Sequence, residues 1–250
     1  MNGLLATAGA HKVATTVIAG ALVLAGGGVV HAAVGGGTTA TVAKVVDGDT
    51  IEVRYDGDTH RVRLLNVNTP ETVDPDKPVE CMGPEASDYL KKRLPVGTEV
   101  RLERDQDTQD GYGRELAAVF LGDDLVNADI ARQGFGVAMS VKPNTKFLAV
   151  VQQAQAEAQQ AGRGLYSSTA VCTVPAQVAA LESAATAATS GQPVTGDALT
   201  SFDAHDTGLA TALATAAALQ SLLDGDASRF PLLALAGGQR DSLELSLIHI

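Results

Sequence analysis

Short segments in which apolar and polar residues alternate begin shortly after residue 38. Five of them are rich in β-branched residues, which is typical of strands with one buried face. They cover residues 39–46, 50–55, 61–67, 98–104 and 115–121. Asp56 and Gly57 separate the second segment from the third, and because this pair takes up positive φ at low cost, they predict a hairpin turn.

Three further segments predict helices, and they cover residues 83–94, 125–134 and 145–162. Pro84 lies near the start of the first, and the other two are closed by glycine. Five strands interrupted and followed by three helices predict an α+β fold, a small closed or partly open β-barrel with helices packed on it. This arrangement resembles the five-stranded oligonucleotide/oligosaccharide-binding fold, or OB-fold.

The N-terminal residues predict a targeting segment. Residues 13–30 carry no charge and follow Lys12, and Val30 and Ala32 are placed like the small residues before a signal-peptidase cut. We therefore predict a signal peptide over residues 1–33 and a linker over 34–38. An uncleaved membrane anchor and a buried helix are the alternatives, although three consecutive glycines within the segment make a poor spanning helix.

The C-terminal part, residues 169–250, differs from the middle of the chain because it is rich in Ala, Thr and Ser. Residues 179–189 and 208–223 predict two helices in this low-complexity extension, and we see no catalytic constellation there. The last six residues, LSLIHI, resemble a translated adapter tail, and such tails are excluded from fold reasoning. The remaining residues, 39–168, predict one globular domain.

The charge of the chain argues against a general polyanion binder. The net charge is −11, and residues 39–168 carry 15 Lys and Arg against 21 Asp and Glu. A protein that binds nucleic acid over a broad face usually carries a basic surface. Any contact with nucleic acid must therefore be local and made by a few placed arginines.

Cys81 and Cys172 are the two cysteines of the chain. In an oxidising compartment they could pair, and closing a loop of this size stabilises a fold by roughly 4–5 kcal/mol in the chain-entropy model. Two free thiols are the alternative. The absence of a Cys-x-x-Cys motif in the sequence argues against a zinc site.

Three segments carry polar residues with a shared chemistry: VVDGDTIEV (45–53), RLLNVNTPET (63–72) and DGYGRELA (110–117). Together they supply carboxylates, an amide, threonine oxygens and two arginines, which suits a hard cation and a phosphate. Each segment alone is weak evidence, because Asp-Gly is common in turns. Arg63 could also be a long side chain at the barrel rim, and Glu71 a solvated turn residue.

The motifs DGDT, RLLNVNTPE, GPEAS, YGR, VNADIARQG and KPN, in this order over about residues 39–168, resemble the thermonuclease, or staphylococcal nuclease-like, family. The resemblance implies a five-stranded barrel with three helices and calcium-dependent cleavage of phosphodiester bonds in DNA and RNA. It further implies that Arg63 and Arg114 bind the phosphate, that Glu71 activates the attacking water, and that Tyr112 lies near the nucleotide's phosphate.

The resemblance also implies a calcium site and three departures from the family pattern. Asp49 is expected to bind calcium through its carboxylate, and Thr69 through its backbone oxygen. Asn68 stands where better-known members have a second calcium-binding Asp, so the amide oxygen replaces a charged ligand. Met139 replaces a nucleotide-stacking tyrosine, and Gly111 replaces a nearby lysine.

These observations predict a secreted or cell-surface, calcium-dependent nuclease acting on DNA or RNA as a monomer. We expect Arg63, Glu71 and Arg114 to face an open, solvated site rather than the core. The alternative is a non-catalytic module on the same fold that binds nucleic acid or a protein. The extension is compatible with either function, for example as a spacer on the cell wall.

Overall fold

The alternating segments of the sequence form a closed barrel. The computed structural model describes residues 37–189, 198–235, 239–240 and 242–243, with the backbone alone for residues 198–205. These residues belong to one compact unit that begins at Gly36. The predicted signal peptide, most of the linker and the LSLIHI tail lie outside the described residues.

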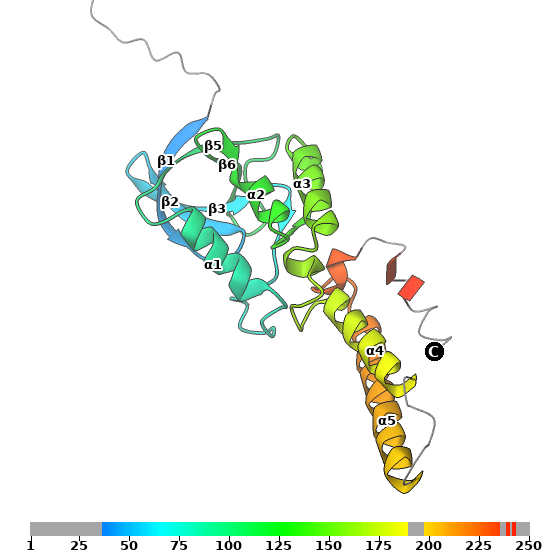
Figure 1. Ribbon diagram of the computed structural model, residues 1–250. Coiled ribbons are helices and arrows are strands. Elements are labelled where there is room, and N and C mark those ends of the chain that lie inside the picture. The colour runs from blue at the N-terminus through cyan, green and yellow to red at the C-terminus, as the bar shows by residue number, and fades with distance from the viewer. Residues whose placement is uncertain (1–36, 190–197, 236–238, 241, 244–250) are drawn as a thin grey trace, which may run out of the picture. The chain divides into compact units, whose positions relative to one another are not determined.

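Five strands make up the barrel, and they are β1 (Thr38–Val45), β2 (Thr50–Tyr55), β3 (Asp58–Leu64), β5 (Glu99–Glu103) and β6 (Glu115–Leu121). Their order is β3-β2-β1-β5-β6, with each neighbouring pair antiparallel. A parallel pairing of β3 with β6 closes the ring (Figure 1). The predicted five-stranded barrel is therefore confirmed.

The first strand bends by means of a bulge. The pairing register of β1 with β2 shifts between Val42 and Lys44. Because of this extra residue, Val42 and Val45 both reach the interior although they are three positions apart. A bulge of this kind increases strand curvature, which a small closed barrel requires.

The prediction for the third strand is partly wrong. The hairpin turn holds, since Asp56 and Gly57 both have positive φ, but β3 already ends at Leu64. Asn66 has a φ of 58° and turns the chain, so that Val67–Asn68 form a separate short strand, β4, paired with β8 (Val137–Ala138). The Asn66 amide donates to the carbonyl oxygens of Met139 and Asn144, and these bonds stabilise the turn.

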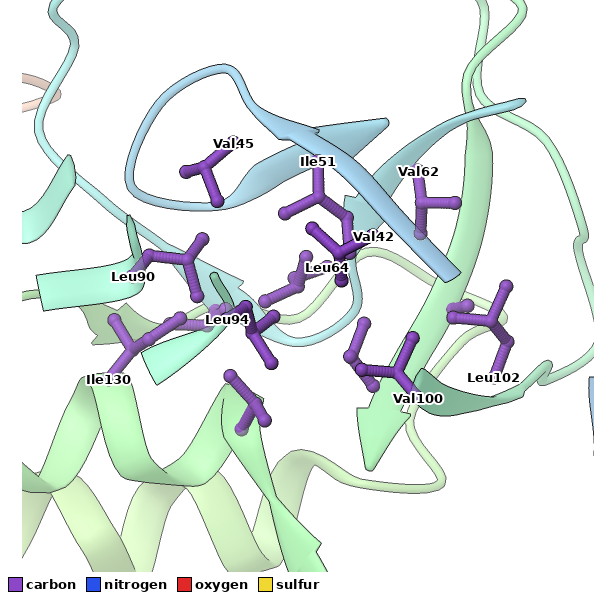
Figure 2. Close-up of a cluster of buried hydrophobic side chains, with 14 of the residues drawn as sticks. Val42, Val45, Ile51, Val62, Leu64, Leu90, Leu94, Val100, Leu102 and Ile130 are labelled. Atoms are coloured by element: carbon purple, nitrogen blue, oxygen red, sulfur yellow. The ribbon is translucent and has the colours of Figure 1, made fainter. Parts of the chain in front are cut away.

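Three helices complete the barrel domain near the predicted positions. They are α1 (Gly83–Arg93), α2 (Val126–Arg132), which follows the two-residue strand β7 (Asp124–Leu125), and α3 (Leu148–Gln160). Figure 2 shows how Leu90 of α1, Leu94 directly after α1 and Ile130 of α2 point toward the apolar side chains of the strands. The barrel interior and the helix faces thus share one core.

The extension contains two helices, α4 (Val174–Thr189) and α5 (Ala198–Leu223), both longer than predicted. Leu181 of α4 packs with Leu219 and Leu223 of α5 in a small apolar cluster. Two short 3₁₀ turns flank the pair, η1 (Gly164–Tyr166) and η2 (Leu232–Ala234). In the described part of the chain, no helix is both long and apolar enough to span a membrane.

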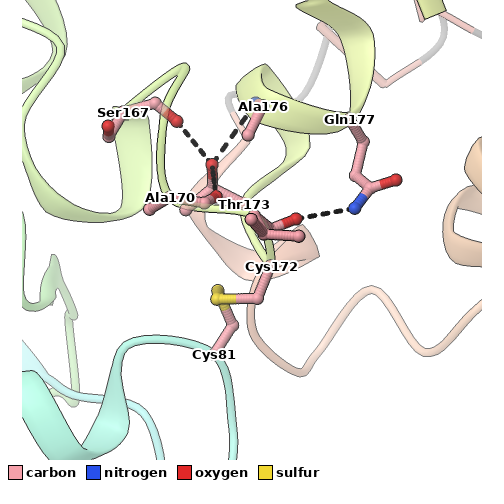
Figure 3. Close-up of a disulfide and its surroundings, with 8 residues drawn as sticks. Cys81, Ser167, Ala170, Cys172, Thr173, Ala176 and Gln177 are labelled. Carbon is pink, nitrogen blue, oxygen red and sulfur yellow. Dashed lines mark hydrogen bonds between the residues drawn. A yellow bond between two sulfur atoms is a disulfide. The ribbon is translucent and has the colours of Figure 1, made fainter. Parts of the chain in front are cut away.

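A disulfide joins Cys81, just before α1, to Cys172, just before α4 (Figure 3). The two Cα atoms lie 5.6 Å apart. The Thr173 hydroxyl next to Cys172 donates to the carbonyl oxygen of Ala170 and accepts from the Ala176 N–H group, which caps the first turn of α4. The extension is therefore covalently tied to the barrel domain at the start of its first helix.

Glu115 joins three strands at one end of the barrel. Its carboxylate accepts from the Tyr55 hydroxyl and from Arg104 Nη2, and lies 2.7 Å from His60 Nδ1. Burial raises the pKa of Glu115, but the hydrogen bonds from Tyr55 and Arg104 outweigh it, so the pKa lies below its usual value. The folded protein therefore favours the carboxylate form.

We expect Glu115→Gln to lower the free energy of unfolding at pH 7 by about 1–3 kcal/mol, because hydrogen bonds to a charged group are lost. A lowered pKa stabilises the fold above the unfolded-state pKa, and this stability is lost as pH falls through the folded-state pKa. The difference between wild type and variant should therefore shrink below about pH 4.

Urea unfolding at pH 7 and at pH 3.5 measures this difference. The control is Asp88→Asn, which removes an exposed carboxylate paired with Lys91 and should change stability by less than about 0.5 kcal/mol. A Glu115→Gln effect of equal size at both pH values would contradict the argument.

Candidate active site

One cavity of about 350 Å³ lies where the turn after β1, the chain after β3 and the loop before β6 meet. All seven residues predicted as catalytic, metal-binding or substrate-binding line it. They are Asp49, Arg63, Asn68, Thr69, Glu71, Tyr112 and Arg114. Barrel closure is responsible for this convergence, because the parallel pairing of β3 with β6 places Arg63 opposite Leu116, two residues after Arg114.

The turn between β1 and β2 carries two buried carboxylates. Asp47 Oδ1 accepts a hydrogen bond from the Asp49 N–H group at 3.0 Å, which folds the turn onto itself. Gly48 between them touches the opposite segment so closely that a Cβ atom would lie 2.7 Å from Thr69 Oγ1. Burial, and then the neighbouring Asp49 carboxylate, raise the pKa of Asp47 to about 6.

Asp49 connects this turn to the segment after β4. Its Oδ2 atom accepts hydrogen bonds from the Thr69 N–H group at 2.8 Å and from the Thr69 hydroxyl at 3.0 Å. The same oxygen lies 3.0 Å from Arg63 Nη2. The carboxylate is therefore oriented by a cation on one side and by backbone and hydroxyl donors on the other.

Arg63 is more buried than the sequence led us to expect, with 8% of its surface exposed. Its Nη1 atom donates to the carbonyl oxygens of Leu64 and Val67, and its Nη2 atom contacts Asn68 Oδ1 and Asp49 Oδ2. The expectation of an open, solvated arginine is wrong at this position. The carbonyl oxygens of Leu64 and Val67, on either side of the turn at Asn66, hold the guanidinium in this buried position.

Glu71 lies three residues after the end of β4, and it is partly buried. Its Oε1 atom accepts hydrogen bonds from the N–H groups of Thr72, Val73 and Asp74, at 2.8, 2.7 and 3.2 Å. These donors fix the orientation of the carboxylate. All three bind the same oxygen of this cavity-lining residue, so these hydrogen bonds do not occupy Oε2.

Arg114 and Tyr112 lie on the other side of the cavity. Arg114 Nε donates to Asp110 Oδ2 at 2.7 Å, and its guanidinium carbon lies 5.5 Å from the centre of the Tyr112 ring. Burial raises the pKa of Asp110, but hydrogen bonds from Arg114 and from the Tyr112 N–H group outweigh it and lower the pKa. Tyr112 itself is 88% exposed, so its ring is accessible to a ligand.

The oxygen atoms at the cavity suit a hard cation. Among the described residues there is no group of three or more His, Cys, Asp and Glu side chains placed to hold a metal ion. Calcium, however, accepts carbonyl and water oxygens beside carboxylates. Asp47 and Asp49 are buried together, and burial first and the Asp49 carboxylate second raise the pKa of Asp47, so a cation beside them would offset both effects. Asn68 and Thr69 add neutral oxygens, so the donor set fits calcium in kind.

Sequence reasoning missed three residues of the site. Asp47 was counted with Asp49 among the carboxylates of the segment VVDGDTIEV, but it was given no role of its own. Asp110 lies four residues before Arg114, and the turn between them brings the two side chains together. Asn66 gives no comparable signal, because its role depends on backbone carbonyls more than 70 residues away.

Comparison with known proteins agrees with this geometry. Residues 61–168 match the model of the family described as "Staphylococcal nuclease homologue". The chain is 46% identical over 124 residues to the thermonuclease of Staphylococcus intermedius. These residues cover 50% of this chain and 73% of that protein. This chain belongs to the staphylococcal nuclease family. It is also 43% identical over 129 residues to the thermonuclease of Staphylococcus hyicus, covering 52% of this chain and 76% of that protein.

The chain is also similar to endonuclease YncB of Bacillus subtilis strain 168. The two are 39% identical over 110 residues, which cover 43% of this chain and 52% of that protein. The family match ends at residue 168, and the extension with α4 and α5 follows it. Most residues that line the cavity therefore belong to the matched part of the chain, and Asp47 and Asp49 precede it.

Proposed function

We propose that this chain is a calcium-dependent nuclease that hydrolyses phosphodiester bonds of DNA or RNA at the cavity between Arg63, Glu71 and Arg114. One observation carries the proposal: two guanidinium groups, a fixed carboxylate and a set of hard oxygen donors line the same cavity in a member of the staphylococcal nuclease family. The names of its relatives, thermonuclease and endonuclease, support the activity.

The two arginines have the chemistry that a phosphodiester requires. The bond to be broken is anionic and gains further charge in the transition state, and guanidinium groups stabilise this charge by paired hydrogen bonds. Arg114 is fixed by Asp110 through Nε, so its terminal nitrogens are directed away from that contact. Tyr112 stands beside it and offers a hydroxyl or its ring to the nucleotide.

Glu71 accepts the proton of the attacking water in this mechanism. A general base must be held within hydrogen-bond reach of the proton it removes. The three N–H donors on Oε1 hold the Glu71 side chain in one orientation. The side chain is therefore already ordered before the reaction, and little conformational entropy is lost when the carboxylate accepts the proton.

Calcium, when bound, would polarise a phosphoryl oxygen and orient the water. Asp49 and Asn68 would hold it through their side chains and Thr69 through its backbone oxygen, with Asp47 close by. Asp49 is paired with Arg63 in the structure, so each of these two charges already has an ionic partner. With both ligands bound, Asp49 would pair with the cation and Arg63 with the phosphate, instead of with each other. This exchange supports a site that binds cation and phosphate together.

The alternative, a module that binds without cutting, is supported by Asn68, because the amide removes one negative charge from the proposed calcium site. A cleavage assay distinguishes the two functions. Single-stranded DNA incubated with the protein should yield fragments in calcium and none with a chelator. Retention of intact DNA in both conditions would favour the binding module.

Export is part of the proposal and is supported by the apolar N-terminal segment and by the disulfide. We expect protein recovered from the culture medium to begin near Ala33 and to carry the Cys81–Cys172 bond. Intact mass would then show the loss of the leader and of two hydrogen atoms. A full-length, fully reduced chain in the medium would contradict both expectations.

For the catalytic residues, we expect Glu71→Gln to lower the initial cleavage rate by a factor of about 100 to 10,000. Arg114→Ala should lower it by roughly 100 to 1,000, because one charge-stabilising donor is lost. Both variants should melt near the wild-type temperature. The combined variant should lose less than the product of the two factors, since both residues act on one transition state.

Arg63 requires a different substitution. Arg63→Ala would leave the buried Asp49 carboxylate unpaired, and breaking such a pair costs about 3–5 kcal/mol. Arg63→Lys keeps the charge but loses the planar fork, so a rate loss with a modest change in melting is expected. The control is Arg61→Ala, because Arg61 lies on the same strand and is exposed; this variant should change the rate less than about twofold.

A near-wild-type cleavage rate for Glu71→Gln would refute the mechanism in which Glu71 is the base.

The metal site gives a separate prediction. Asn68→Asp adds a carboxylate beside Asp49, so we expect the calcium concentration for half-maximal rate to fall by up to about tenfold. A calcium titration of the cleavage rate measures this value. Gln106→Glu is the control, because it adds the same charge at an exposed position. If Asn68→Asp leaves the value unchanged or raises it, Asn68 is not a calcium ligand.

A further inference from the structure

The segment from Glu71 to Glu80 is a closed loop whose two end residues are hydrogen-bonded to each other. The Glu71 N–H group donates to Glu80 Oε2 at 3.0 Å, and the Glu80 N–H group donates to the Glu71 carbonyl oxygen at 2.9 Å. These two bonds form the neck of the loop. The position of Glu71 therefore depends on where Glu80 is held.

Glu80 is a buried carboxylate, with 9% of its side chain exposed. A carboxylate at this depth requires a partner, because an unpaired buried charge is costly. Its partner is Arg229, whose Nε atom donates to Glu80 Oε1 at 2.8 Å, while Nη2 lies 3.5 Å from the Pro78 carbonyl oxygen. Arg229 belongs to the extension, 149 residues further along the chain.

Two additional contacts hold Arg229 in place. The next residue, Phe230, is 7% exposed and packs in an apolar cluster with Val137 and Leu165, against which Met82 also packs. Val137 pairs with Asn68 in the two-stranded sheet of β4 and β8. The disulfide from Cys81 to Cys172 ties the residue after Glu80 to the start of α4. The extension is thus fastened to the Glu71 loop on both sides of Glu80.

We propose that the extension positions the catalytic base: Arg229 neutralises and orients Glu80, and Glu80 fixes the backbone of Glu71. This inference rests on the proposed role of Glu71. Arg229 lies in the extension, beyond the part of the chain that matches the family, and acts through Glu80 rather than on the substrate. Arg229 and Glu80 are therefore positioning residues.

The test compares the full chain with Arg229→Gln, using kcat and KM for single-stranded DNA in saturating calcium together with a thermal melt. We expect kcat to fall about tenfold, less than the roughly hundredfold loss that a misplacement of 1 Å can cause. KM should change less than about twofold, because the arginines that bind the phosphate are untouched. Arg229→Lys should restore part of kcat, since an ammonium can still pair with Glu80.

The matched control is Arg240→Gln, an identical substitution in the same extension at a residue that donates to the Leu223 carbonyl oxygen. Its kcat should stay within about twofold of wild type. In a Glu71→Gln background, Arg229→Gln should cause no further loss, because no base is left to position. The proposal would be overturned if Arg229→Gln and Arg240→Gln lowered kcat equally. It would also be overturned if Arg229→Gln lowered kcat as much in the Glu71→Gln background as in the wild type.

Glu80→Gln keeps the inference testable if Arg229→Gln alone fails to fold. Glutamine retains an acceptor for the Glu71 N–H group but carries no charge, so Arg229 is no longer required as a counter-ion. The double variant Glu80→Gln/Arg229→Gln should fold and match Glu80→Gln in kcat; a further tenfold loss would overturn the proposal. If Glu71→Gln itself cleaves like wild type, the proposed base is wrong; if only the Arg229 effect is missing, the positioning role alone falls.

Discussion

The buried pair of Arg63 and Asp49 organises the site and the end of the barrel strand that carries it. Both side chains are about 9% exposed, so neither charge is compensated by bulk water. Burying an ion pair is costly unless further hydrogen bonds satisfy the remaining donors and acceptors. Here the carbonyl groups of Leu64 and Val67 accept from the guanidinium, and Thr69 donates twice to the carboxylate. The break between β3 and β4 supplies those carbonyl groups.

This arrangement also explains how an acidic chain can present a site for an anion. The net charge of the chain is −11, yet two arginines face the cavity. Each is held by one aspartate, Arg63 by Asp49 and Arg114 by Asp110. The cationic groups are therefore oriented before a ligand arrives, and long-range attraction of nucleic acid is replaced by local recognition.

The extension changes the surroundings of the site without contributing to its cavity. In the proposed nuclease, the loop that begins with Glu71 lies between β4 and α1 and contains no helix or strand of its own. A charged pair, an apolar cluster and a disulfide attach it to the extension. A long loop gains order from such cross-links, since they reduce the number of conformations that compete with the folded one.

Local patterns in the sequence were sufficient to predict most of the fold. The β-branched alternation of the strands, the Asp56-Gly57 turn and the glycines that end the helices act within a few residues, so their effect can be seen in the sequence. The residue types of the site were likewise visible in three short motifs. The tertiary structure brought these motifs into one cavity.

Contacts between distant residues were decided by the tertiary structure alone. The end of β3 at Leu64 depends on Asn66 meeting the carbonyl groups of Met139 and Asn144. The burial of Arg63 depends on that break, and the pairing of Glu80 with Arg229 depends on the packing of the extension. A sequence pattern records the preferences of neighbouring residues, whereas these contacts arise only when chain closure brings complementary groups to the same place.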